Sequence, residues 1–120
     1  MKKSVIYQHS GVDHPLYLTI DGQIVFHKIV THLLSVGTWS ESYLELVASA
    51  SATYQNYVRA QKEVNENGVT TTTVGGALKK NPAVDVSASC FRDFMAFTNK
   101  FGLNPLFSEK VPQIEEESEI

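Results

Sequence analysis

Three stretches of the chain place apolar residues every three or four positions, which is the spacing of amphipathic α-helices. The first is expected to begin at Asp21 as N-cap and to end before Gly37, because glycine adopts the left-handed conformation beyond a helix without a Cβ clash. Thr38-Trp39-Ser40-Glu41 then matches a capping box and opens a longer helix that ends at Asn67-Gly68. Isolated helices are only marginally stable in water, so this long helix needs a partner along its length.

A β-hairpin is predicted between the long helix and the third helical stretch. β-Branched residues fill 69–74, and a Gly-Gly pair at 75–76 separates them from 77–80. This pattern is typical of two strands joined by a two-residue turn. A lone hairpin is marginally stable in water, so we expect it to lean on the helices or on a neighbouring subunit.

The third helix is predicted to begin at Asn81-Pro82, with asparagine as the N-cap and proline at the first helical position, and to end at Gly102. Asn104-Pro105 repeats this start and is expected to open a short last helix over 106–111. The third helix carries one apolar face, whose members are Ala83, Val86, Cys90, Phe94, Phe97 and Phe101. Cys90 is therefore expected to be a small buried hydrophobe.

Together these elements predict a mainly α fold. Two long helices form a helical hairpin joined by a small β-hairpin at about 69–80, with an N-terminal helix and a short C-terminal helix. We expect residues 1–20 to be a partly ordered N-terminal segment, 21–111 to be a single helical domain and 112–120 to be an acidic tail.

Charge is unevenly distributed along the chain. The net charge is −3, but residues 111–120 carry four glutamates and no base, so residues 1–110 hold 10 basic and 9 acidic groups, a balance of +1. The net charge therefore does not exclude DNA binding by the helical body. No apolar run approaches the ~20 residues that span a bilayer, and the single cysteine fits a reducing compartment. We expect no membrane partner and a cytoplasmic location.

Patterns that carry catalysis are missing from the sequence. There is no glycine-rich phosphate loop ending in Gly-Lys, no Gly-x-Ser-x-Gly nucleophile elbow, and too few cysteines for a thiolate zinc cluster. We therefore expect no enzyme activity, no catalytic residues, no cofactor and no small-molecule substrate.

All four histidines, His9, His14, His27 and His32, fall within the first 32 residues. His27 and His32 are five positions apart, about 140° around a helix, whereas a pair that shares a face is spaced i, i+4. We therefore expect no metal site, and surface or partly packed imidazoles instead.

Several basic residues are candidates for DNA contact. Lys79-Lys80 precedes the helix that starts at Pro82, and the free N–H groups of a helix start suit phosphate. The full candidate set is Lys2, Lys3, Lys28, His32, Lys79 and Lys80. A tight turn at Gly37-Thr38 between the first two helices would also resemble a helix-turn-helix in outline.

The order of several short motifs resembles the compact family of tailed-phage terminase small subunits. These motifs are Tyr54-x-x-Tyr57, Gly68, Gly75-Gly76, Asn81-Pro82-Ala83 and Phe101-Gly102-Leu103-Asn104-Pro105. The similarity covers roughly residues 20–110, with Asn104 where the family commonly has threonine. The resemblance assigns a structural role in the motif to Gly68, Asn81, Pro82, Phe101, Gly102, Leu103 and Pro105.

The resemblance implies a non-enzymatic DNA-packaging subunit in a bacterial host cell. Such a subunit forms a homo-oligomeric ring, binds phage double-stranded DNA and activates the large ATPase–nuclease subunit. Tyr54, Tyr57 and Val58 are the candidate subunit contacts. Two alternatives remain open from the sequence: a phage assembly protein that binds no DNA, and a small helix-turn-helix transcriptional regulator.

Overall fold

The computed structural model describes residues 7–103 of the 120-residue chain, and its elements confirm the predicted mainly α fold. The predicted last helix at 106–111 and the acidic tail at 112–120 lie outside the described residues, as do Lys2, Lys3 and Pro105. In chain order the elements are helix α1 (Ile20–Ser35), a 3₁₀ turn η1 (Glu41–Tyr43), helix α2 (Leu44–Asn67), strands β1 (Thr70–Thr72) and β2 (Leu78–Lys80), and helix α3 (Pro82–Lys100).

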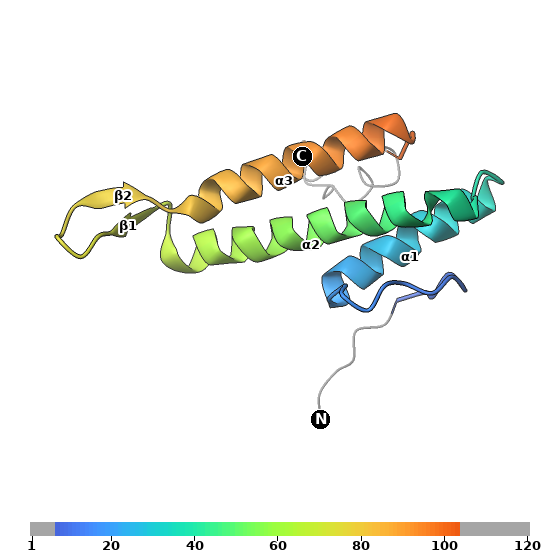
Figure 1. Ribbon diagram of the computed structural model, residues 1–120, viewed down its shortest axis with the longest axis horizontal. Helices are drawn as coiled ribbons and strands as arrows, with labels where there is room; N and C mark the ends of the chain where they lie inside the picture. Colours follow the sequence, from blue (N-terminus) through green and yellow to red (C-terminus); the bar gives the residue numbers. More distant parts are fainter. Residues whose placement is uncertain (1–6, 104–120) are drawn as a thin grey trace, which may run out of the picture.

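Helices α2 and α3 run antiparallel beside each other, and the β-hairpin that joins them extends beyond their ends (Figure 1). Helix α1 packs against the N-terminal half of α2, far from the hairpin. The molecule is therefore elongated, with three helices at one end and the hairpin alone at the other. Among the described residues, no helix is long and apolar enough to cross a bilayer.

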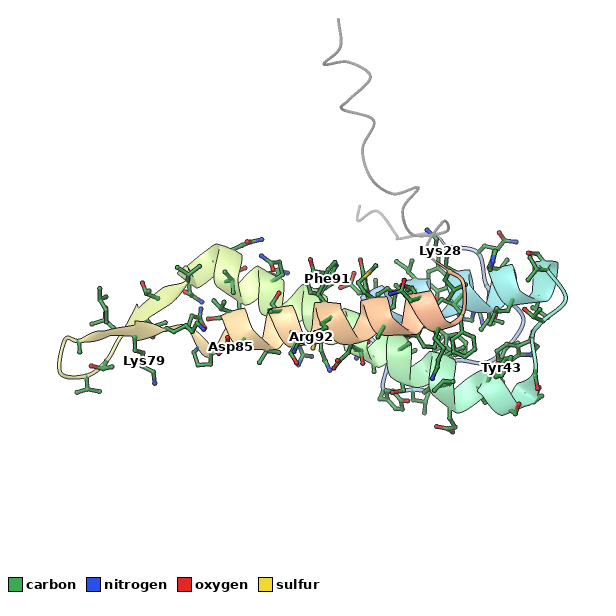
Figure 2. The ribbon with its side chains drawn as sticks, turned by 90° about the horizontal axis from the view of Figure 1, so that it is seen from above. Lys28, Tyr43, Lys79, Asp85, Phe91 and Arg92 are labelled. Atoms are coloured by element: carbon green, nitrogen blue, oxygen red, sulfur yellow. The ribbon has the colours of Figure 1, made fainter. Side chains whose placement is uncertain are left out.

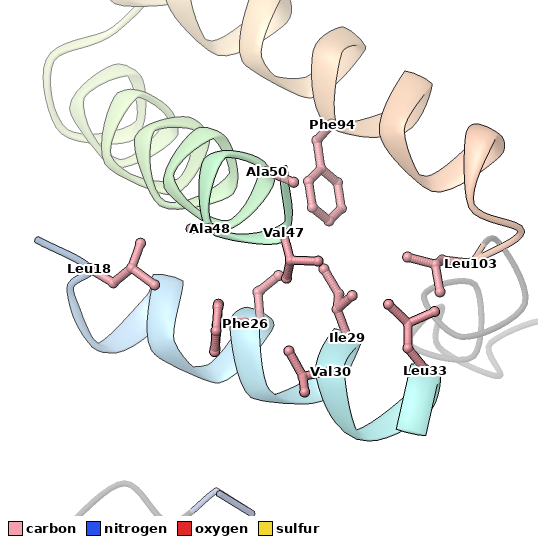
Figure 3. Close-up of a cluster of buried hydrophobic side chains, with 11 residues drawn as sticks. Leu18, Phe26, Ile29, Val30, Leu33, Val47, Ala48, Ala50, Phe94 and Leu103 are labelled. Atoms are coloured by element: carbon pink, nitrogen blue, oxygen red, sulfur yellow. The ribbon is translucent and has the colours of Figure 1, made fainter. Parts of the chain in front are cut away.

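The hydrophobic core lies where α1, the first turns of α2 and the last turns of α3 meet (Figure 3). Phe26 and Ile29 of α1 are fully buried against Val47 of α2, and Phe94 reaches the same cluster from α3. Burial of each such side chain stabilises the fold by about 1.5–3 kcal/mol. The core thus fixes α1 on α2 and anchors only the hairpin-distal half of α3.

Small residues let the helices approach closely along α2. Its buried positions are Val47, Ala48, Ala50, Ser51 and Ala60. On α1, Gly22 faces α2, and a Cβ there would collide with the side chain of Gln55.

The start of α1 is completed by Gln55 of α2, whose Oε1 accepts hydrogen bonds from the N–H (2.8 Å) and the hydroxyl (3.1 Å) of Thr19, which is the N-cap of α1. The prediction of Asp21 as N-cap was wrong, because Gln55 satisfies the start of the helix two residues earlier.

The predicted capping box at 38–41 was also wrong, because Thr38 belongs to the end of α1. Gly37 has φ +78, and the N–H groups of Gly37 and Thr38 donate to the carbonyls of Leu34 (3.2 Å) and Leu33 (2.9 Å), as in a Schellman motif. The next helical residues are instead capped by Ser40, whose Oγ accepts from the Ser42 N–H. The connection from 36 to 43 is therefore longer than the tight turn that a helix-turn-helix requires.

The β-hairpin has the predicted position but a longer turn. Thr70 pairs with Lys80 and Thr72 with Leu78, and the Thr73 N–H donates to the Ala77 carbonyl at 2.8 Å. Three residues, 74–76, therefore form the loop, and Gly76 takes φ +91 as its last member. This is the usual geometry of a three-residue hairpin loop with glycine at the left-handed position.

Helix α3 begins and ends as predicted, at the Asn81 cap and at Gly102, but its buried face differs. Ser87, Phe94 and Thr98 are buried, whereas Val86 is 47% exposed and Cys90 only half-buried. Ser87 faces α2, where its hydroxyl donates to Gln61 Oε1 at 2.8 Å. The contact near the hairpin is therefore partly polar, which an apolar periodicity cannot reveal.

Asn81 joins three elements at the base of the hairpin. It is 3% exposed, its Oδ1 accepts from the Ala83 N–H (3.0 Å), and its Nδ2 donates to the Gly68 carbonyl (2.8 Å). The side chain thus caps α3 and holds the end of α2 at the same time.

We expect Asn81→Ala to lower the free energy of unfolding by about 1–2 kcal/mol, because a helix cap and a buried hydrogen bond are lost together. Urea denaturation followed by circular dichroism measures the change. Asn56→Ala, at an exposed position in the interior of α2, is the matched control and should leave stability equal or slightly higher. Equal stability of Asn81→Ala and the wild type would contradict the role given to Asn81.

Candidate functional site

The four candidate residues for DNA contact that the structure describes, Lys28, His32, Lys79 and Lys80, lie at two distant places (Figure 2). Lys79 lies on the projecting hairpin, and Lys28 lies on α1 near the opposite end of the molecule. The structure brings Lys79 together with Lys80, and Lys28 together with His32, but keeps the two pairs apart. The two pairs of one chain therefore do not form one continuous contact surface for DNA.

The hairpin site combines basic, hydroxyl and apolar groups. The Lys80 ammonium contacts Asp85 of α3 at 3.0 Å, and both side chains are more than half exposed. Lys79 is opposite Thr71 in the neighbouring strand. A groove of about 440 Å³ at the base of the hairpin is lined by Val69, Thr70, Leu78, Lys79, Lys80 and Val84.

On α1, Lys28 and His32 are one helical turn apart and line a cavity of about 410 Å³. Tyr7 and Thr31 line the same cavity. Among the described residues, Thr31 Oγ1 is the buried side-chain oxygen without a hydrogen-bond partner. The lining of the cavity is mostly apolar, with the polar groups of Lys28, Thr31 and His32 on its α1 side.

The candidate subunit contacts are used within the chain. Tyr54 packs against Phe94 and Tyr57 against Phe91, with ring centroids 5.1 and 5.5 Å apart, so both tyrosines help join α2 to α3. Burial raises the pKa of Tyr54. Val58 instead lines a small cavity, together with Asp21 and Arg59. A subunit contact through these three residues stays a prediction, and it could use only the parts of the side chains that remain exposed.

The motif residues within the described range lie at the ends of the long helices. Gly68 follows α2, and Asn81 and Pro82 begin α3. Gly102 lies beyond the end of α3, and the buried Leu103 donates its N–H to the Thr98 carbonyl at 2.8 Å, which completes a second Schellman motif. Phe101 is the C-cap of α3, and its ring packs against Tyr43. These residues therefore begin or end the long helices.

Three histidines converge at the surface of α1, which the sequence did not predict. His27 is fully buried on α1, and His9 and His14 come from the preceding segment. One ring nitrogen from each lies within 4.8 Å of the others, so these three imidazoles could hold a metal ion. The spacing along α1 considered only His27 and His32, whereas the contact depends on how the segment before the helix folds back.

Hydrogen bonds hold the His27 ring in place. His27 Nε2 lies 2.8 Å from His14 Nδ1, and His27 Nδ1 accepts from the Ser10 N–H at 3.1 Å. The Ser10 hydroxyl lies 2.8 Å from the same Nδ1. Tyr7 stacks on the ring with centroids 5.4 Å apart and donates its hydroxyl to Gln23.

The protonated form of His27 is strongly disfavoured. Burial, together with the neighbouring His9 and His14, lowers its pKa from 6.5 to about 4, against an opposing effect of the Asp13 carboxylate. The imidazole is therefore neutral at physiological pH. A neutral ring can accept a hydrogen bond from Ser10 and donate one to His14.

Comparison with protein families finds a match over most of the chain. A family described as "Phage terminase, small subunit" matches residues 22–118, which is 97 of the 120 residues and contains all of α2, the hairpin and α3. No curated protein and no solved structure matches the chain significantly. His9 and His14 precede the matched range.

We expect acid to destabilise the protein through His27, measured in a chelator-containing buffer. The unfolded state binds a proton near pH 6.5 and the folded state only near pH 4, so stability is full above about 6.5 and falls between these values. The loss at pH 4 is about 2–3 kcal/mol, since one pKa unit corresponds to ~1.4 kcal/mol. Urea denaturation at several pH values measures it.

The control variants for this prediction are His27→Gln and His32→Gln. His27→Gln should lower the free energy of unfolding at every pH, because it removes a buried ring. It should also flatten the dependence of that free energy on pH between pH 4 and 6.5. His32→Gln should keep the wild-type dependence. An unchanged slope in His27→Gln would show that other groups cause the acid sensitivity.

Proposed function

Because this chain belongs to the phage terminase small-subunit family, which acts in packaging phage DNA, we propose that it is the DNA-recognition and regulatory subunit of a packaging machine. In this role it binds phage double-stranded DNA, assembles as a homo-oligomeric ring and activates the large ATPase–nuclease subunit, without catalysing a reaction itself. The observation that carries the proposal is the family match, which extends over most of the chain.

The hairpin is our first candidate for DNA contact. The major groove of B-DNA admits a two-stranded β-ribbon, and this ribbon projects away from the helices (Figure 1). Its strands carry consecutive threonine hydroxyls at 70–72 and the ammonium groups of Lys79 and Lys80. The ion pair between Lys80 and Asp85 is exposed, and such pairs contribute only about 0–1 kcal/mol. Lys80 can therefore exchange this partner for a phosphate.

The second basic place, at Lys28 and His32 on α1, is the other candidate. Each chain offers only a few basic groups there, and the net charge of −3 works against strong binding by one subunit. A ring repeats each weak site, and simultaneous contacts raise the overall affinity without new interactions. Oligomerisation and DNA binding thus support each other in this proposal.

Exposed apolar side chains of α3 and of the hairpin are our candidates for the subunit contact. Val86 and Phe91 are 47% and 48% exposed, and Phe91 is next to the half-buried Tyr57 of α2. On the hairpin, Val69 and Leu78 are 59% and 73% exposed. A second copy that covers these side chains would remove apolar surface from water, at about 25 cal/mol per Å².

Lys79→Ala combined with Lys80→Ala should weaken DNA binding in a salt-dependent way. Each lysine that contacts a phosphate contributes about one to the slope of log K against log salt concentration, so the double variant should lose about two for each subunit in contact. Fluorescence anisotropy with duplex phage DNA at several salt concentrations measures the slope. Lys100→Ala, an exposed lysine in the last turn of α3, is the control and should keep it. An affinity that does not respond to salt would contradict contact with phosphate.

Phe91→Glu should lower the mass of the assembly in solution, because it places a charge in the proposed apolar contact. Multi-angle light scattering measures the mass, and circular dichroism checks that the helices remain. The control Leu16→Glu changes a side chain that is already fully exposed and should leave the mass unchanged. A wild-type protein that is a monomer would contradict the ring.

A further inference from the structure

The three imidazoles of His9, His14 and His27 are placed together by two different parts of the chain. His27 is carried by α1, whereas His9 and His14 lie on the segment that runs back over it. We propose that these three side chains bind one divalent transition-metal ion of the Zn²⁺ type, which cross-links the N-terminal segment to α1. This inference is independent of DNA packaging and of the residues proposed for it.

The distances between the nitrogens are close to those of a bound metal. Zinc binds imidazole nitrogen at about 2.0–2.1 Å, which places two ligand nitrogens of a tetrahedral site about 3.3 Å apart. The three nitrogens here lie within 4.8 Å of one another, and His14 Nδ1 and His27 Nε2 are only 2.8 Å apart. Closing the site therefore requires movements of at most about 1.5 Å.

These movements fall on backbone that can accommodate them. His27 is fixed by α1 and by its burial, but residues 7–10 and 13–15 form no helix or strand. His9 and His14 can therefore shift without breaking the hydrogen bonds of a helix. The hydrogen bond from the Gly11 N–H to His9 Nδ1 (2.9 Å) is exposed, so water can replace the imidazole as acceptor.

The proton on His27 has a place to go when a cation binds. In the arrangement described above, Nδ1 accepts from the Ser10 N–H, so Nε2 carries the proton and shares it with His14. A metal at Nε2 requires the proton on Nδ1, where the Ser10 hydroxyl at 2.8 Å can accept its hydrogen bond; the Ser10 N–H then loses Nδ1 as its acceptor and must turn to water as the segment shifts. Metal-binding histidines usually donate their second nitrogen in this way. The ring stays neutral, and the cation takes the position of the shared proton.

The ligand type selects the class of metal. Imidazole suits zinc, copper and nickel, whereas magnesium and calcium prefer oxygen ligands. Three protein nitrogens leave a fourth position of a tetrahedral site for water. The Asp13 carboxylate, adjacent in sequence to His14, is close enough to stabilise positive charge on His27 and would do the same for a bound cation.

Cobalt titration tests the site directly. The full chain, without any affinity tag and freed of metal by a chelator, is titrated with Co²⁺, whose visible absorption is much stronger in tetrahedral than in octahedral coordination; Zn²⁺ then displaces it. We expect one equivalent per chain, and no displacement by Mg²⁺. His9→Gln and His14→Gln should each bind at least about 100-fold more weakly, because losing a ligand costs more than the 10–100-fold typical of losing an outer-shell partner. The fourth histidine provides the matched control, and His32→Gln should bind like the wild type.

Chymotrypsin gives a readout of the cross-link itself. Leu16 and Tyr17 are 100% and 60% exposed and lie between the ligands on the segment and α1. We expect Zn²⁺ to slow cleavage there in the wild type and in His32→Gln, but not in His14→Gln. The proposal is overturned if the wild type binds no Co²⁺ or Zn²⁺, if His9→Gln and His14→Gln bind as tightly as the wild type, or if His32→Gln weakens binding equally. None of these results would bear on DNA binding by the hairpin lysines.

Discussion

The long helix α2 determines the rest of the architecture, because a helix of 24 residues must cover its apolar positions with other elements. It does so with two partners of different kinds. Near its start, α1 buries Phe26 and Ile29 against it in the apolar core, whereas toward the hairpin α3 meets it through the Tyr57–Phe91 ring contact and the Ser87–Gln61 hydrogen bond. The apolar core therefore lies at the end of α2 that is far from the projecting hairpin (Figure 1).

This division separates the scaffold from the candidate sites. Leu103 and Phe94 close the core far from the hairpin, so the exposed lysines at β2 contribute little to the packing of the helices. Exposed groups on a projecting ribbon are free to contact a partner because no buried contact depends on them. The histidine cluster, by contrast, includes the buried His27, which the N-terminal segment contacts through Ser10 and His14. A change there affects how the N-terminal segment is held.

The fold was predictable where the signals are local. Gly68, Asn81-Pro82 and Gly102 end or begin helices by their own backbone preferences, and the structure confirms each of these boundaries. Two of the errors arose where a distant residue intervened: Gln55 of α2 completes the start of α1, and Gln61 draws Ser87 into the helix contact. The convergence of His9, His14 and His27 was not predicted for the same reason, because the periodicity of a sequence does not record a segment that folds back on a helix.

The hydrogen bonds from Thr19 to Gln55 have a consequence for folding. In an ordinary capping box a side chain within the same helix satisfies the N-cap amide, so the helix start can form before any tertiary contact exists. Here the acceptor belongs to a helix 36 positions away along the chain. The first turn of α1 is therefore completed only when α2 is in place. The capping of α1 at Thr19 and its docking on α2 are therefore coupled.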